Sequence, residues 1–238
     1  MHARMLTLAL GTLVLLGLAV GLWGTYRLGG PRYLAHRLFT LEPWPTYTQR
    51  LSQLDLLPVD SLDVVLLGDS HVAYGLWQEW LPDVAVANRG ISGDDLPGVR
   101  RRLGALGLSP RHAVVVQVGT NDLLFRGPDA VLADYDRLLD DLADLDVRAV
   151  AICTLPGVNN RVRATHLDAD AVAAVNERLR VLAHERGVVL LDLAAALDSR
   201  DGVLAAELTD DGVHLRGEGY RRWARLLAAY LGEATASG

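Results

Sequence analysis

The stretch that decides the fold is Val64-Val65-Leu66-Leu67-Gly68-Asp69-Ser70-His71, where a short apolar run ends in a polar turn. Four more apolar runs follow along the chain, at residues 84–87, 113–118, 149–153 and 188–191. Short, valine-rich runs of this kind are typical of strands that are buried on both faces. We therefore expect each run to be a strand inside a sheet.

Between these runs, apolar residues repeat with the period of a helix, as in Val131, Tyr135, Leu138 and Leu142. Similar stripes occur at residues 96–106, 172–182 and 220–227. A regular alternation of strands and helices predicts an α/β fold, in which a parallel sheet is covered by helices on both sides.

An uncharged segment covers residues 5–26, and Met5 to Trp23 is almost wholly apolar. As a helix, this apolar core would span roughly 28 Å, about one hydrocarbon thickness. We favour an uncleaved transmembrane helix over a cleaved signal peptide, because the apolar region is long and lacks an Ala-x-Ala cleavage site. Arginines gather after the segment, so the positive-inside rule alone would keep the rest of the chain cytoplasmic.

The remaining chain is long enough for one well-buried core. Residues 27–60 have the features of a connector, since Gly29-Gly30-Pro31 and Pro43-Trp44-Pro45 break regular structure, although a short helix is expected near residues 46–55. The predicted organisation is thus a membrane anchor or signal segment at 1–26, a connector at 27–60 and one α/β domain at 61–238.

Charge and cysteine content exclude several classes of function. Residues 1–50 contain five Arg and one acidic residue, so a net charge of −6 for the whole chain leaves −10 on the remainder. An acidic domain argues against nucleic acid as a partner, because phosphate binding needs a basic face. Cys153 is the only cysteine, which excludes an intramolecular disulfide and predicts a buried thiol.

Polar loops that contain glycine follow the predicted strands and precede the last helix. They are Gly68-Asp69-Ser70-His71, Asn88-Arg89-Gly90-Ile91-Ser92-Gly93-Asp94, Gly119-Thr120-Asn121-Asp122 and Asp211-Gly212-Val213-His214-Leu215. Ligands of a parallel sheet bind beyond the carboxyl ends of its strands. We therefore expect the four loops to meet at one edge and to form the site.

These loops hold the side chains that nucleophilic catalysis needs. A serine such as Ser70 is a poor nucleophile until a base such as His214 takes its proton. Asp211 precedes that histidine by three residues and could orient its ring. The Gly90 N–H and the Asn121 amide could stabilise an oxyanion. Taken singly, each loop could also be an ordinary turn or helix cap, but their joint placement favours a site.

The four blocks, in this order, resemble those of the SGNH (GDSL-type) esterase, lipase and acylhydrolase family over about residues 63–231. The resemblance implies a flavodoxin-like, three-layer α/β/α sandwich with a five-stranded parallel sheet. It implies a triad of Ser70, His214 and Asp211, and an oxyanion hole formed by the N–H groups of Ser70 and Gly90 with the Asn121 side chain. No metal and no organic cofactor is expected.

Other residues carry weaker predictions. His71 stands where the family often has Leu or Ile, and we favour a ring that points to solvent over one that contacts substrate. Trp77 and Trp80 could wall an acyl pocket or belong to the core. The histidines at 166 and 184 have acidic neighbours but lack the spacing of metal ligands.

The function expected from the sequence is a serine esterase or acylhydrolase that cleaves small acyl esters, including O-acetyl esters, through an acyl-enzyme. Its substrate would be a lipid or an O-acetylated carbohydrate. Two alternatives stay open: an acyltransferase that modifies envelope polysaccharide, and a catalytically silent domain that binds an acylated ligand. The resemblance favours a membrane-anchored, extracytoplasmic enzyme, against the distribution of arginine described above.

Overall fold

In the computed structural model, residues 45–236 are described, and they belong to one compact unit that begins at Pro45. The predicted transmembrane helix at 1–26 lies outside the described residues, as does the first part of the connector. Within residues 45–236, no helix is both long and apolar enough to cross a membrane.

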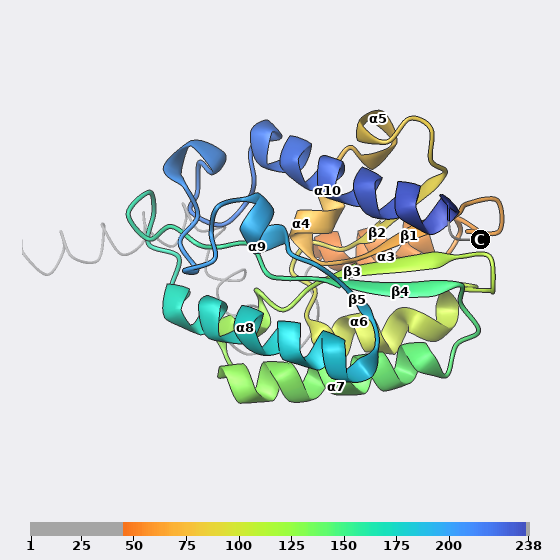
Figure 1. Cartoon of the computed structure of the whole chain (residues 1–238), viewed down its shortest axis with the longest axis horizontal. Coiled ribbons are helices and arrows are strands. Elements are labelled where there is room, and N and C mark those ends of the chain that lie inside the picture. The colour runs from red at the N-terminus through yellow and green to blue at the C-terminus, as the bar shows by residue number, and fades with distance from the viewer. Residues whose placement is uncertain (1–44, 237–238) are drawn as a thin grey trace, which may run out of the picture. The chain divides into compact units, whose positions relative to one another are not determined.

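The centre of the unit is a five-stranded sheet in the order β2-β1-β3-β4-β5, and every neighbouring pair of strands is parallel (Figure 1). The strands are β1 Val64–Gly68, β2 Val86–Gly90, β3 Ala113–Gln117, β4 Ala149–Cys153 and β5 Val189–Leu191. The sheet predicted from the apolar runs and from the family resemblance is therefore confirmed.

Strand β2 is the one strand that differs clearly from its predicted range of 84–87. Its pairing with β1 continues through Asn88, opposite Leu66, to Gly90, opposite Gly68. β2 forms one edge of the sheet, where polar side chains do not have to enter the core on both faces. Hydropathy marks the start of such a strand but misses its polar end.

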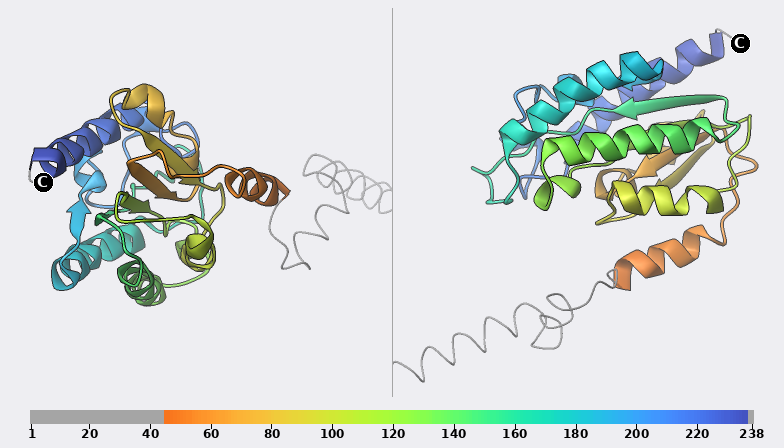
Figure 2. Two further views of the ribbon diagram at one scale, coloured as in Figure 1. Left: turned by 90° about the vertical axis from the view of Figure 1, so that its right-hand side faces the viewer. Right: turned by 90° about the horizontal axis from the view of Figure 1, so that it is seen from below.

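Helices cover both faces of the sheet, which gives three layers (Figure 1 and the left view of Figure 2). One face carries α6 Leu96–Arg102, α7 Pro128–Ala143 and α8 Ala169–Arg186. The other carries α4 Ser70–Ala73, α5 Trp77–Trp80, α9 Leu193–Ala196 and α10 Gly217–Ala236. The described residues also contain three short 3₁₀ turns: η1 Leu103–Ala105, η2 Asp122–Leu124 and η3 Ala206–Leu208.

The alternation of side chains along β3 divides the core in two. Val114 and Val116 belong to the cluster beneath α6, α7 and α8, whereas Val115 belongs to the cluster beneath α4, α5 and α10. This follows from strand geometry, in which successive side chains point to opposite faces. Tyr135 and Trp223 are the largest fully buried side chains of the two clusters. The helical stripes that contain these two residues are therefore core faces, as the sequence predicts.

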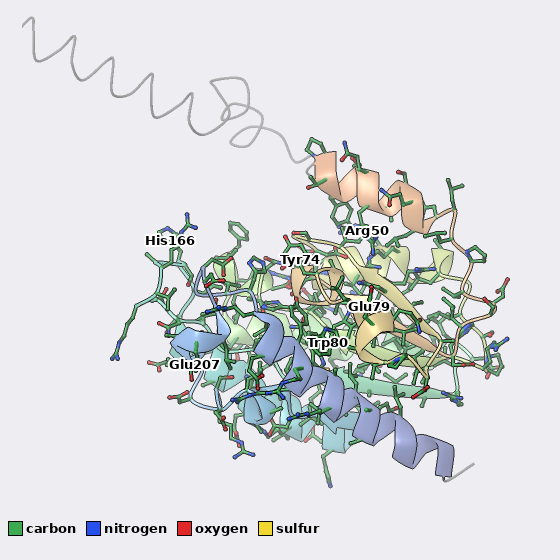
Figure 3. All side chains as sticks on the ribbon, turned by 90° about the horizontal axis from the view of Figure 1, so that it is seen from above. Arg50, Tyr74, Glu79, Trp80, His166 and Glu207 are labelled. Atoms are coloured by element: carbon green, nitrogen blue, oxygen red, sulfur yellow. The ribbon has the colours of Figure 1, made fainter. Side chains whose placement is uncertain are left out.

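Residues 45–60, which the sequence assigns to the connector, lie in the compact unit. They include α3 Pro45–Leu54, and the Arg50 guanidinium on this helix donates to the carbonyls of Asn88 (3.3 Å) and Gly90 (3.4 Å) on β2 (Figure 3). Val59 is 1% exposed and packs with Val65 and Ala87. Tertiary contacts, and not periodicity, place this segment with the domain.

Truncation of Val59 to Ala tests this placement. We expect the free energy of unfolding to fall by about 1–3 kcal/mol, because two buried methyl groups are lost. Leu56→Ala is the matched control, since Leu56 is 83% exposed and its loss should change stability by less than about 0.5 kcal/mol. Urea unfolding would measure both, and equal effects of the two variants would contradict the placement.

Candidate active site

The first loop places Ser70 directly beyond the end of β1, as the first residue of α4. Asp69 caps this short helix by accepting the His71 N–H at 2.9 Å. Gly68 is required at the turn, because a Cβ there would lie 1.8 Å from the Gln117 carbonyl oxygen. Gly68 lies on β1 and Gln117 on β3, so the close contact of these two strands fixes the position of the serine.

The structure brings Ser70, His214 and Asp211 into one hydrogen-bonded chain. His214 Nε2 lies 2.9 Å from Ser70 Oγ, and His214 Nδ1 lies 2.6 Å from Asp211 Oδ2. The other carboxylate oxygen, Asp211 Oδ1, accepts the backbone N–H groups of Val213 (2.9 Å) and His214 (2.8 Å). This arrangement leaves the Nε2 lone pair facing the serine hydroxyl.

The protonation state of Asp211 suits that role. Burial alone would raise its pKa, but the hydrogen bonds from the His214 ring and from the N–H groups of Val213 and His214 outweigh burial. Together they hold the pKa of this carboxyl well below its ordinary value. The carboxylate is therefore ionised at neutral pH and keeps the proton of the imidazole on Nδ1.

The turn that carries Asp211 and His214 is braced by the loop after β4. Gly212 has a φ of 84°, and its carbonyl accepts the Asn159 N–H at 2.7 Å. Its own N–H donates to Thr209 Oγ1 at 2.9 Å. A Cβ on Gly212 would lie 2.6 Å from the Asn159 carbonyl oxygen, so a larger residue would push the two loops apart.

Gly90 does not have the role predicted for it. Its N–H donates to Asn88 Oδ1 at 3.0 Å and is therefore not directed at a substrate oxygen. A Cβ at this position would lie 2.3 Å from the Ala73 nitrogen, so the glycine allows β2 to pack closely against α4. The sequence prediction is corrected here, because a close backbone approach explains this glycine.

Gly93, which the sequence analysis did not single out, offers a better donor. It occupies the third position of a turn closed by the Asp94 N–H and the Ile91 carbonyl (3.1 Å), with a φ of 80°. Its N–H has no acceptor within residues 45–236. The Gly93-Asp94 pair at the end of the second block was the signal in the sequence, since a tight turn before a helix cap favours glycine.

Asn121 lies in the third loop, next to the second. Its Nδ2 donates to the Asp94 carbonyl at 2.8 Å, which uses one of the two amide hydrogens and orients the group. Asp95, and not Asp94, caps α6, because its side chain accepts the Gly98 N–H at 2.7 Å. The Asp122 carboxylate accepts the N–H of Leu96, and this contact joins the same two loops. Asp122 also forms an ion pair with Arg126.

A buried ion pair fixes the second loop to the strand that precedes the serine. Arg102 Nε donates to Asp94 Oδ2 at 2.8 Å, and Arg102 Nη2 donates to the Gly68 carbonyl at 3.1 Å. Tyr47 on α3 donates its hydroxyl to Asp94 Oδ1 at 3.2 Å. Burial and the charge of Asp94 raise the pKa of Tyr47 to about 12, so the hydroxyl stays a donor.

The structure decides between the two roles that the sequence left open for Trp77 and Trp80. Trp77 belongs to the core, with its ring edge against Trp223 at a centroid distance of 4.8 Å. Trp80 lines a cavity with Asp63 and Arg148, which precede β1 and β4 and so lie at the opposite edge of the sheet. Neither tryptophan walls an acyl pocket at the triad.

Two further side chains lie beside the triad: Tyr74, which the sequence analysis did not single out, and His71, which it placed wrongly. Tyr74 is 52% exposed, its ring centroid is 5.2 Å from that of His214, and its hydroxyl is 2.9 Å from Ser92 Oγ (Figure 3). His71 was expected in solvent, but it is buried. Its Nδ1 lies 3.2 Å from Asp69 Oδ1 and its Nε2 lies 3.0 Å from the Val213 carbonyl oxygen.

The part of the chain from residue 45 to 236 contains no cluster of three or more His, Cys, Asp or Glu side chains with the geometry of a metal site.

Comparison with known proteins identifies the family of the chain. The family model described as GDSL-like Lipase/Acylhydrolase matches residues 66–222. None of the curated protein sequences matches the chain.

Several solved structures share the fold. A GDSL-like lipase from Bacteroides thetaiotaomicron is similar with a TM-score of 0.65 and 22% identity, over 79% of this chain and 98% of that one. An acetyl xylan esterase is similar with a TM-score of 0.59 and 21% identity, over 70% and 98%. A variant of an acetyl-xylooligosaccharide esterase from Geobacillus is similar with a TM-score of 0.57 and 19% identity, over 72% and 94%.

The family model covers well over half of the chain and includes the serine, the second and third loops and the histidine turn. The family predicted from the four sequence blocks is confirmed. The chain belongs to the GDSL-like lipase/acylhydrolase family of hydrolases.

Proposed function

We propose that this protein is a serine esterase that cleaves small acyl esters through an acyl-enzyme on Ser70. The observation that carries the proposal is the continuous chain from Ser70 Oγ to His214 (2.9 Å) and from His214 to Asp211 (2.6 Å). A histidine that is held between a hydroxyl and an ionised carboxylate is arranged for general-base catalysis.

The reaction proceeds in two acyl transfers. Ser70 Oγ attacks the ester carbonyl carbon while His214 Nε2 takes the hydroxyl proton. The tetrahedral intermediate collapses when that proton passes to the departing alkoxide, which leaves as the alcohol. Water then attacks the acyl-serine, His214 again takes and returns a proton, and the carboxylic acid leaves Ser70 restored. Asp211 stabilises the imidazolium in both halves.

The oxyanion of each tetrahedral intermediate needs preorganised donors. We assign this role to the N–H of Ser70, the N–H of Gly93 and the second amide hydrogen of Asn121. The Ser70 N–H lies in the first turn of α4, where backbone donors have no acceptor within the helix. Asn121 supports the assignment because its Asp94 contact already orients the amide.

As the substrate class we propose an O-acetylated carbohydrate. Two of the solved structures above are esterases of acetylated xylan or its oligosaccharides, and the exposed Tyr74 ring beside His214 offers a flat apolar surface on which a sugar can stack. The same triad could pass its acyl group to a sugar hydroxyl in place of water. Product analysis with and without an acceptor oligosaccharide separates hydrolysis from transfer.

We also propose that residues 1–26 tether the enzyme to a membrane and that the catalytic domain acts outside the cytoplasm. The uncharged segment 5–26 supports the tether. Protease digestion of intact cells tests the side: loss of the domain supports the proposal, and protection of the domain in intact but not in lysed cells contradicts it.

Replacement of Ser70 by Ala tests the nucleophile. We expect hydrolysis of p-nitrophenyl acetate, butyrate and octanoate by the full chain to fall about a thousandfold or more, and covalent labelling by a fluorophosphonate to disappear. Ser52→Ala is the control, because Ser52 lies on α3 and bonds only the Gln49 carbonyl. Activity that survives in a folded Ser70→Ala variant would refute the proposal.

Replacement of Asn121 by Ala tests the oxyanion hole. We expect kcat to fall about 10²–10³-fold with little change in KM, because the lost donor acts on charge that develops in the transition state. Gln53→Ala is a suitable control, since Gln53 is an exposed amide side chain on α3. A rise in KM at constant kcat would instead place Asn121 in ground-state binding.

A further inference from the structure

The residue after the proposed nucleophile forms a second buried histidine–carboxylate pair beside the triad. His71 is 1% exposed and Asp69 is 0% exposed. The His71 ring lies between Asp69 Oδ1, 3.2 Å from Nδ1, and the Val213 carbonyl oxygen, 3.0 Å from Nε2. Nothing in the proposed acyl transfer uses this pair, so its burial needs a separate explanation.

The partners of the ring determine its protonation. A carbonyl oxygen only accepts hydrogen bonds, so Nε2 must carry a hydrogen to bond Val213. Asp69 Oδ1 already accepts the His71 backbone N–H at 2.9 Å and acts as an acceptor for Nδ1 as well. Two acceptors facing two ring nitrogens select the imidazolium, in which both nitrogens donate.

The carboxylate supports the same conclusion. Asp69 Oδ2 is buried and has no hydrogen-bond partner within residues 45–236. A buried carboxylate without further donors needs a counter-charge close by, and His71 supplies it. Burial alone would lower the pKa of His71, but the hydrogen bond and charge of Asp69 and the Val213 carbonyl outweigh it and raise the pKa.

The pair also connects two parts of the site that are far apart in sequence. His71 is next to Ser70, whereas Val213 is next to His214 and lies 142 residues further along the chain. Tyr220 at the start of α10 donates its hydroxyl to the His71 carbonyl at 2.9 Å. The ring therefore ties the turn of the nucleophile to the turn of the base.

The electrostatic surroundings of His71 come from three elements. Asp69 lies on its own turn, and Asp211 and His214 face it from the catalytic turn, with the two imidazole centroids 5.6 Å apart. Tyr220 faces its carbonyl from α10. The Asp69–His71 pair thus lies directly beside the imidazole of the proposed base.

We propose that His71 is a positioning residue: as an imidazolium it bridges Asp69 and the Val213 carbonyl and holds His214 against Ser70. The kinetic part of this proposal rests on the proposed esterase function. The protonation state of His71 does not, and it can be measured on a protein without any activity.

His112 provides an internal reference for that measurement. It is also 0% exposed, and its Nε2 lies 3.0 Å from the Val59 carbonyl oxygen. Its Nδ1, however, accepts the Ser109 N–H at 2.9 Å and so must hold a lone pair. The chain thus contains two buried histidines with the same kind of contact at Nε2 and opposite contacts at Nδ1.

The first experiment is a histidine-selective ¹⁵N NMR spectrum of the full chain at neutral pH, assigned with His71→Gln and His112→Gln. The proposal requires that both ring nitrogens of His71 have the chemical shift of a protonated nitrogen. His112 should show one protonated and one unprotonated nitrogen. An unprotonated Nδ1 in His71 overturns the proposal, whether or not the protein hydrolyses any ester.

The second experiment compares kcat and KM for p-nitrophenyl acetate in two variants. His71→Gln keeps a donor for the Val213 carbonyl but loses the charge, and His71→Leu loses both.

The two variants should differ in turnover. We expect kcat to fall roughly tenfold in His71→Leu and less in His71→Gln, with KM unchanged, because only the leucine variant releases the catalytic turn. His112→Gln should leave kcat unchanged. If folded His71→Leu keeps the kcat of the unsubstituted chain, the positioning role is wrong.

Discussion

One buried ion pair holds the site in register. Arg102 joins Asp94 to the Gly68 carbonyl, so the second loop is fixed to the end of the strand from which the nucleophile follows. The Asp94 backbone carbonyl in turn orients Asn121, and its side chain accepts the Tyr47 hydroxyl. A single aspartate thus sets the relative positions of four segments. Removal of either partner would leave an uncompensated buried charge. Because all four segments contact this pair, we expect such a change to displace them together.

The second buried carboxylate, Asp69, shows the other use of the same chemistry. Asp94 is paired with a guanidinium that cannot lose its proton, whereas Asp69 is paired with an imidazolium that can. The first pair stabilises the frame of the oxyanion donors, and the second lies between the nucleophile and its base. Arg102 therefore keeps its charge, whereas the charge of the second pair depends on the protonation of His71.

The sequence predicted the features that depend on local pattern and missed those that depend on distant partners. Valine-rich runs identified the parallel sheet, and the loop blocks identified Ser70, Asp211 and His214 as neighbours. The end of β2 was missed because an edge strand tolerates polar residues. Gly90 was given the wrong role because the Asn88 side chain that takes its N–H is visible only in the structure. His71 was expected in solvent because its partner, Val213, lies 142 residues away.

Helix α3 has a consequence for how the molecule behaves among its copies. β2 forms an open edge of the sheet, and such edges present unpaired backbone groups that can template pairing with another chain. Arg50 occupies the carbonyls of Asn88 and Gly90, which are alternate residues of that edge. The segment before the first strand thus covers the β2 edge of the sheet with a charged side chain and a helix, which is one of the ways in which proteins block pairing between copies.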